Sequence, residues 1–236
     1  MNSLGERFAH VKQIAYAELP SRSPWERLLD HLYLWLVDHG FLRALYDNRY
    51  RLAGDLYRSG QLSPSQVRQL SRELKLRSLI NLRGYKRQGA TLRLEAEASH
   101  RRRLPFFVIR SLSRGLLSRE ELLDIIGFVK TVELPALVHC KSGADRVGHF
   151  SVLYRHLRLG EPIERAMQEL HWRYGHIAVA KTGMLDHFFD SYLRDRAPFQ
   201  SFEDWVRHSY EPAKLRKTFK PVGWLSWVVD HILRRE

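Results

Sequence analysis

Hydrophobic residues recur at helical spacing near the start of the chain. In the segment 23–46 (SPWERLLDHLYLWLVDHGFLRALY), Ser23 is a candidate N-cap and Pro24 fits the first turn. Six apolar residues share one face: Trp25, Leu28, Leu29, Leu32, Trp35 and Leu36. A face of this width predicts a helix that packs on a core. A helix lying on a membrane surface is the alternative, and Asp30 and Asp38 argue against it.

Beyond residue 55, short strands are predicted to alternate with helices. The segment 56–76 (LYRSGQLSPSQVRQLSRELKL) predicts a strand, a turn and a helix capped near Ser63. The segment 77–84 (RSLINLRG) predicts a compact strand that ends in Arg83 and Gly84.

The same alternation continues toward the C-terminus. A helix begins at Ser118, which has capping-box spacing to Glu121. The segment 134–140 (LPALVHC) predicts a buried strand, followed by a helix that ends at Gly160 and a further helix with Pro162 in its first turn. The alternation predicts an α/β fold with a central, mainly parallel sheet flanked by helices.

Composition limits the class of protein. Of the 236 residues, 44% are hydrophobic and 28% are charged, which is typical of a globular protein with a substantial core. No apolar run approaches the roughly 18 residues that cross a bilayer, and the N-terminal segment lacks the apolar stretch of a cleaved signal. The single cysteine fits a reducing compartment. We therefore expect a cytoplasmic protein.

The net charge is strongly positive. Lysine and arginine number 39 against 26 Asp and Glu, which gives a formal charge of +13. Such a surface attracts phosphorylated proteins and anionic small-molecule or lipid phosphates, although it can also serve solubility alone. Nucleic acid is not expected as a partner, because no helix-turn-helix, zinc-finger, RRM or KH pattern is present. A peripheral membrane contact is compatible with the charge but is not favoured.

The candidate chemistry lies in one short stretch, VHCKSGADRVGH (138–149). Cys140, the only cysteine, ends the predicted buried strand, at the edge where ligands bind in open α/β sheets. Gly143 lets the backbone approach a ligand, and N–H groups in such a turn before a helix form an anion site. Arg146 can bind two oxygens of one phosphate. The positive field would favour the nucleophilic thiolate of Cys140, whereas a cysteine that merely packs is the alternative.

This stretch resembles a known signature. HCKSGADR (139–146) is similar to the His-Cys-five residues-Arg motif of cysteine-dependent tyrosine and dual-specificity phosphatases, and the likeness covers about Leu56 to Leu159. The resemblance implies that Cys140 attacks phosphorus and forms a phosphocysteine, which water then hydrolyses without a metal or other cofactor. It also implies that the phosphoryl oxygens are held by Arg146 and by the backbone of the loop residues Lys141, Ser142, Gly143, Ala144 and Asp145.

The general acid of that superfamily is usually an Asp in a loop before the signature strand. In this chain the segment 98–119 contains no Asp or Glu. A poor leaving group still needs a proton, so Asp145 is the candidate acid. Its position resembles the loops of myotubularin lipid phosphatases and of some bacterial phosphatases that act on phosphoproteins and phosphoinositides. The alternative for Asp145 is a carboxylate favoured by the helix N-terminus, and Asp186 is then the next candidate acid.

A second departure from the family pattern follows the arginine. The family usually has Ser or Thr at that position, whose hydroxyl steadies the thiolate, whereas this chain has Val147. Slow turnover of the phosphocysteine is therefore expected, unless Ser142 or water compensates. A catalytically weak pseudophosphatase that binds phosphorylated partners is one alternative function.

Other candidate residues lie outside the motif. Tyr174 and His176 are candidates for lining the cleft. His171, His176 and His187 fit no common metal-ligand spacing, so buried or capping roles are expected. Two arginines end predicted strands and could face phosphate, although structural ion pairs are the commoner use: Arg58 and Arg83.

The resemblance divides the chain into three expected parts. A helical extension covers 1–50, a phosphatase domain with a dual-specificity-type fold covers 51–196, and a second helical extension packed on the domain covers 197–236. The last part includes the amphipathic segment 223–236 (GWLSWVVDHILRRE). The expected function is hydrolysis of phosphotyrosine, phosphoserine or phosphothreonine in proteins. Phosphoinositides, inositol phosphates and other lipid or sugar phosphates are alternative substrates, supported by the charge and by Lys141 and Asp145 in the loop.

Overall fold

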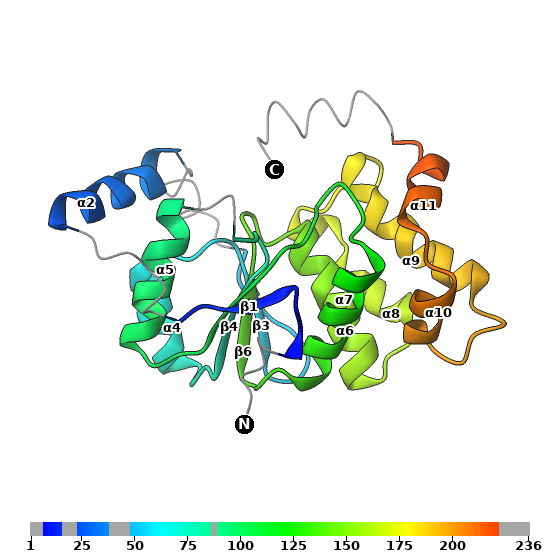
Figure 1. Cartoon of the computed structure of the whole chain (residues 1–236), viewed down its shortest axis with the longest axis horizontal. Coiled ribbons are helices and arrows are strands. Elements are labelled where there is room, and N and C mark those ends of the chain that lie inside the picture. Colours follow the sequence, from blue (N-terminus) through cyan, green and yellow to red (C-terminus); the bar gives the residue numbers. More distant parts are fainter. Residues whose placement is uncertain (1–6, 16–22, 38–47, 86–88, 222–236) are drawn as a thin grey trace. The chain divides into compact units, whose positions relative to one another are not determined.

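A computed structural model describes residues 7–15, 23–37, 48–85 and 89–221 (Figure 1). The chain forms two compact units, each described by itself below. The sheet unit comprises Val11–Arg110 and Val132–Gly143, and the helical unit comprises Phe8–His10, Ser111–Thr131 and the chain from Ala144 onward. The segment 223–236, with its predicted amphipathic character, lies outside the described residues.

Six strands form one sheet in the order β1-β5-β4-β6-β3-β2. They are β1 (Val11–Gln13), β2 (Tyr50–Arg51), β3 (Leu56–Ser59), β4 (Ser78–Asn81), β5 (Phe106–Ile109) and β6 (Ala136–His139). The four inner strands pair in parallel, whereas the edge strands β1 and β2 are antiparallel to their neighbours. The predicted α/β fold class with a mainly parallel sheet is confirmed. β6, which leads to Cys140, lies between β4 and β3.

Two helices of the sheet unit cover one face of the sheet, α4 (Pro64–Glu73) and α5 (Gly89–Arg101) (Figure 1). α4 begins at the predicted cap, where the Ser63 hydroxyl accepts from the Gln66 amide and the Gln66 side chain accepts from the Ser63 amide. The apolar side chains of both helices and of the inner strands share one core, including Val67, Leu70, Leu79, Leu92, Ala96 and Leu137.

The first helix is present but does not pack as predicted. α2 (Pro24–Leu32) continues as one π-helical segment (Tyr33–Val37) and is capped by Ser23 as expected. The apolar face that we expected on the core is exposed, with Trp25 65% and Leu36 66% accessible. The physical reason is that the polar side of α2 docks on the protein through a buried ion pair, described below.

The helical unit begins with α6 (Arg119–Thr131) and α7 (Asp145–Leu159) and continues through α8 (Ile163–Ala166), α9 (Met184–Asp195), α10 (Phe202–His208) and α11 (Pro212–Thr218). α7 ends at Gly160 in the left-handed conformation, as predicted. The core of the helical unit is aromatic and includes Phe188, Phe189, Phe202, Trp205 and Tyr210. None of the helices in the described ranges is both long and apolar enough to cross a membrane.

The helix predicted after Pro162 is present but short, and Pro162 is its N-cap. Only the four residues of α8 are α-helical, and short 3-10 turns follow at Met167–Glu169 and Trp172–Tyr174. The reason is the buried Glu169 carboxylate, which accepts from Arg155 Nη1 of α7 at 2.9 Å and fixes a turn. This segment then packs so closely on α7 that a Cβ on Gly148 would lie 2.9 Å from the Glu169 carbonyl oxygen.

Candidate active site

Cys140 follows the last residue of β6 and is 1% exposed. The residue before it, His139, is fully buried, and its Nε2 lies 2.7 Å from Glu95 Oε1 of α5. The other oxygen of Glu95 accepts from Asn81 Nδ2 of β4 at 2.8 Å. A network of buried polar side chains therefore fixes the orientation of His139 and, through the backbone, the start of the loop.

Arg83 belongs to the same network. Its Nη1 donates to Gln61 Oε1 at 2.9 Å, its backbone amide donates to Asn81 Oδ1 at 2.8 Å, and Gln61 Nε2 lies 3.3 Å from Glu95 Oε2. The sequence pattern does not indicate this network. The only available signal was the presence of Asn81 and Glu95, polar residues in otherwise apolar segments.

The loop after β6 holds its carbonyl groups outward. The Lys141 oxygen accepts from the Gln61 amide at 3.1 Å, and the Ser142 oxygen accepts from Asn48 Nδ2 at 2.9 Å. The Gly143 oxygen accepts from Arg58 Nη2 at 2.8 Å. Because three successive carbonyl groups bind donors outside the loop, the loop is held in one conformation. Arg58, which we considered as a possible phosphate ligand, is completely buried and binds this carbonyl group.

Gly143 allows this loop conformation. Its φ is +74°, in the left-handed region, and a Cβ there would lie 2.8 Å from the backbone of Ser59 and Gly60. Its own amide donates to Cys140 Sγ at 3.2 Å. The Gly143 amide, one of the groups that predict an anion site in the sequence, therefore contacts the thiol.

The remaining part of the motif belongs to the helical unit. Ala144 precedes α7 and is buried, Asp145 is the first residue of α7, and Arg146 is the second and 7% exposed. Val147 is fully buried, and its carbonyl oxygen accepts from Ser151 Oγ at 2.7 Å.

Asp145 is paired with His176, which the sequence pattern does not reveal. Asp145 Oδ1 lies 2.8 Å from His176 Nδ1, and His176 Nε2 lies 2.7 Å from Asp186 Oδ2. The two candidate acids therefore share one buried histidine. Residues 145, 176 and 186 lie too far apart in the sequence for their spacing to indicate this contact.

The protonation of His176 follows from its two partners. Burial opposes the charged imidazolium, but the hydrogen bonds and negative charges of Asp145 and Asp186 outweigh it and raise the pKa of His176 to about 9. At neutral pH the histidine is therefore protonated and donates to both carboxylates. The imidazolium thus presents one N–H to each of the two carboxylates.

The other predicted side chains have structural contacts. Tyr174 is buried, and its hydroxyl accepts from Arg173 Nη2 at 2.5 Å. His171 caps a 3-10 turn by accepting from the Arg173 amide, and His187 Nε2 lies 2.8 Å from Thr218 Oγ1. Within the described part of the chain, no three side chains of His, Cys, Asp or Glu are grouped to hold a metal ion.

Comparison with known proteins gives solved structures of similar fold. No family model matches the sequence, and no curated protein matches it. TpbA of P. aeruginosa matches with a TM-score of 0.48 and 21% identity, over 68% of this chain and 89% of that chain. The catalytic core of the PP-IP phosphatase SIW14 from S. cerevisiae matches with a TM-score of 0.46 and 17% identity, over 66% and 97%. PTPMT1 matches with a TM-score of 0.48 and 14% identity, over 64% and 99%. The likeness is one of chain trace.

Proposed function

We propose that the protein hydrolyses phosphomonoesters with Cys140 as the nucleophile. The observation that carries the proposal is the loop after β6, whose three carbonyl groups bind outside donors while the Gly143 amide donates to Cys140 Sγ. A loop of this conformation, followed by the N-terminus of the 15-residue helix α7, is suited to bind a phosphoryl group.

The reaction proceeds in two displacements. Cys140 Sγ attacks phosphorus, the S–P bond forms, and the bond between phosphorus and the leaving oxygen breaks. The loop amides of residues 141–145 and the Arg146 guanidinium bind the oxygens that carry the developing charge. Water then attacks the phosphocysteine, inorganic phosphate leaves, and the thiolate is restored.

Asp145 supplies the proton for the leaving oxygen in this proposal. Its contact with His176 supports the role, because the protonated histidine can pass its Nδ1 proton to Asp145 Oδ1, and the carboxyl group formed in this way then turns and donates that same proton to the leaving oxygen. The step leaves His176 neutral and Asp145 ionised. Asp186 holds the far side of the histidine ring and keeps Nδ1 directed at Asp145.

Phosphorylated tyrosine, serine or threonine in proteins is the proposed substrate. A specific observation favours a second candidate, a phosphoinositide or inositol phosphate: the net charge of +13, together with Lys141 in the loop, suits a substrate with several phosphates. Among the similar structures, TpbA is known in complex with pTyr and PTPMT1 in complex with PI(5)P. Both substrate classes therefore belong in the test.

The test is a panel of phosphopeptides, phosphoinositides, inositol phosphates and p-nitrophenyl phosphate, with the wild type and Cys140→Ser. We expect wild-type turnover on at least one class, insensitivity to EDTA, and loss of all turnover in Cys140→Ser. Activity that survives in the Ser variant, or that a chelator abolishes, would contradict the mechanism. Binding by the wild type without any turnover would instead identify a pseudophosphatase.

A further inference from the structure

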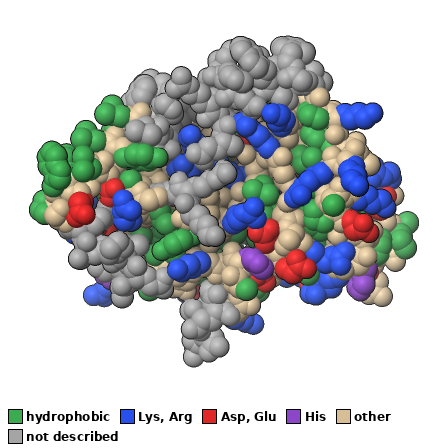
Figure 2. Space-filling model, turned by 45° about the horizontal axis from the view of Figure 1, so that its top comes forward, with side chains coloured by type: hydrophobic (Ala, Val, Ile, Leu, Met, Phe, Trp, Pro, Cys, Tyr) green, Lys and Arg blue, Asp and Glu red, His purple; other side chains and the backbone are tan. Residues whose placement is uncertain are grey.

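α2 and the π-helical segment after it carry their apolar face outward. Among the described residues of this helix, seven large apolar side chains are between 44% and 66% exposed: Trp25, Leu28, Leu29, Leu32, Tyr33, Trp35 and Leu36. They recur at the three- and four-residue spacing of one helix face. Figure 2 shows hydrophobic side chains gathered at the left of the view, where Figure 1 places α2. We call these seven residues the apolar face.

The opposite side of α2 is fixed to the protein by charge. Asp30 is 5% exposed and binds Arg93 of α5 through two contacts, Nη2 to Oδ1 at 2.7 Å and Nε to Oδ2 at 3.3 Å. Arg27 Nε lies 3.5 Å from Glu97 Oε1 of the same helix. Leu34, 4% exposed, is the apolar residue on this side.

This arrangement is the reverse of that in an ordinary surface helix, which buries its apolar side and exposes its polar side. Turning α2 over would bury the apolar face but would separate a buried carboxylate from its arginine, which is costly. The ion pair between Asp30 and Arg93 therefore maintains the outward orientation. Soluble monomers seldom expose an apolar patch of this kind unless it binds something.

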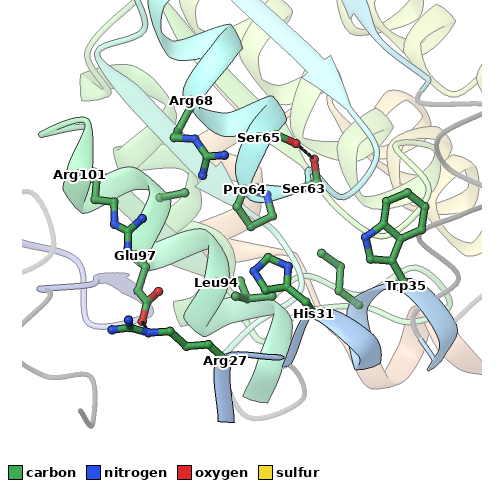
Figure 3. A pocket seen from close by; sticks show the side chains of 12 residues that line it. Arg27, His31, Trp35, Ser63, Pro64, Ser65, Arg68, Leu94, Glu97 and Arg101 are labelled. Carbon is green, nitrogen blue, oxygen red and sulfur yellow. Dashed lines mark hydrogen bonds and ion pairs between the residues drawn. The ribbon is translucent and has the colours of Figure 1, made fainter. Parts of the chain in front are cut away.

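A basic cavity adjoins the apolar face. It has a volume of about 360 Å³ and lies between α2, α4 and α5 (Figure 3). His31 and Trp35 line it from α2 and the π-helical segment, and Arg68 and Arg101 line it from α4 and α5. Both arginines are exposed, and the one carboxylate among the lining residues, Glu97, lies 3.5 Å from Arg27. Trp35 belongs to both the cavity and the apolar face.

We propose that the apolar face and the basic cavity together bind the surface of an anionic lipid bilayer. The apolar face enters the boundary between headgroups and acyl chains, where Trp and Tyr are favoured and Leu side chains leave water. The cavity receives the phosphate of an acidic headgroup, which Arg68 and Arg101 attract. This inference does not depend on the proposed catalytic function.

Charge decides between a bilayer and a second copy of the chain as the occupant. A two-fold dimer through the apolar face would bring together two chains of +13 charge, with the arginines of both cavities close to the contact. Like charges placed in this way oppose association. An anionic bilayer offers the opposite charge and attracts each basic residue near its surface.

The experiment is co-sedimentation of the full chain with vesicles of phosphatidylcholine alone or mixed with phosphatidylglycerol. We expect the wild type to bind the mixed vesicles, and binding to weaken at least about tenfold in Trp25→Ser/Leu36→Ser, which loses two interfacial side chains. We expect Arg68→Ala/Arg101→Ala to lose about fivefold for each arginine removed. Because the four side chains are exposed, the thermal midpoint should stay at the wild-type value.

Two control variants match these changes. Trp172→Ser/Val179→Ser removes two other exposed apolar side chains, 77% and 52% accessible, and Lys214→Ala/Lys217→Ala removes two other exposed charges. Both controls should bind as the wild type does. The proposal is overturned if the wild type does not bind the mixed vesicles, or if control and test variants lose binding equally. It is also overturned if light scattering shows a dimer that Trp25→Ser/Leu36→Ser dissociates.

Discussion

His176 lies between two aspartates, and this contact changes the expected behaviour of the candidate acid. An isolated Asp145 would have to take up each proton from solvent. With the protonated imidazolium 2.8 Å away, a proton is held beside it in every turnover at neutral pH. His176 is therefore expected to act on the reaction through Asp145, as a positioning residue and a proton store.

His176→Gln should lower the turnover of substrates with poor leaving groups much more than that of substrates with good ones. A poor leaving group such as an alkyl alcohol needs a proton, so its turnover should fall about a hundredfold, whereas p-nitrophenyl phosphate should change little. The comparison of kcat on the two substrates checks this, with His187→Gln as a control that removes a histidine of α9. Equal losses on both substrates would indicate damage to the loop rather than a missing proton.

The pH dependence provides a second measurement on the same variant. The pKa of His176 is raised to about 9, so the imidazolium is present below that pH and is lost as the pH rises through it. Wild-type turnover of an alkyl phosphate should decline on that alkaline side. The decline should be absent from the profile of His176→Gln, and an unchanged profile would exclude His176 as its source.

Gly143 and Gly160 offer a matched pair of substitutions. Both have positive φ, at +74° and +71°, but a Cβ meets the backbone of Ser59 and Gly60 only at Gly143, and nothing lies within 4 Å at Gly160. Gly160→Ala should reduce the free energy of unfolding by about 1 kcal/mol through φ alone. Gly143→Ala should cost about 1–3 kcal/mol more, because the loop must shift, and it should also lose phosphatase activity.

Urea denaturation and turnover of p-nitrophenyl phosphate measure the two effects. Similar losses of stability in both alanine variants, with activity retained at Gly143→Ala, would mean that the loop tolerates the added methyl group. The close contact between the loop and β3 would then have no functional importance.

The helices and strands that could be predicted are those whose sequence marks where they begin or end. α4 begins with a capping box and α7 ends at a glycine. β6 is a short apolar run that leads to Cys140. α5 and β5 are not visible in the pattern, because α5 is buried along most of its length and β5 on all four residues, so periodicity is lost. The orientation of α2 depends on Arg93, which is distant in sequence, and no local pattern could indicate it.

A further titrating side chain lies at the contact between α7 and α9. His149 of α7 is 6% exposed and contacts the rings of Phe188 and Phe189 of α9. Burial lowers the pKa of His149 to about 4, so the folded protein keeps it neutral while the unfolded chain protonates it below about 6.5. Stability from this residue is therefore present above that pH and is lost as the pH falls toward 4.

His149→Leu should reduce this acid sensitivity. The free energy of unfolding of the variant, measured by urea denaturation from pH 7 to pH 4, should fall less steeply than that of the wild type. The slope is the relevant quantity, since the substitution also changes packing by a constant amount. Parallel slopes would show that His149 is not the residue that titrates.

For the whole molecule, the charge of +13 should govern encounter with anionic substrates. Raising the ionic strength shortens the screening length from ~10 Å at 0.1 M to ~3 Å at 1 M. We expect kcat/KM for an inositol polyphosphate to fall about tenfold or more over this range, and that for p-nitrophenyl phosphate to fall much less. Stopped assays at several salt concentrations measure both values of kcat/KM. An equal salt dependence for the two substrates would contradict the prediction that the net charge speeds up their encounter with the protein.

Only those residues of the candidate site that are close together in the sequence could be predicted. Cys140, Gly143 and Arg146 stand within seven residues, so their common chemistry is visible in the sequence. The buried support of the loop comes from Asn48, Arg58 and Glu95, whose positions depend on how strands and helices pack. Such contacts between distant residues leave no spacing to detect.

Cys140 is the only thiol in 236 residues, and it lies 1% exposed at the base of the loop. Any reagent that alkylates a thiol can therefore label this chain at one atom only, and the mass of the intact protein counts the labelled fraction directly. In the proposed function the loop binds a phosphoryl group, so a small anionic reagent such as iodoacetate should gain on a bulky maleimide when both rates are compared with those for a free thiol. Added phosphate, arsenate or vanadate should slow the labelling of Cys140. The extent of this protection ranks the affinities of the anions without an assay of turnover.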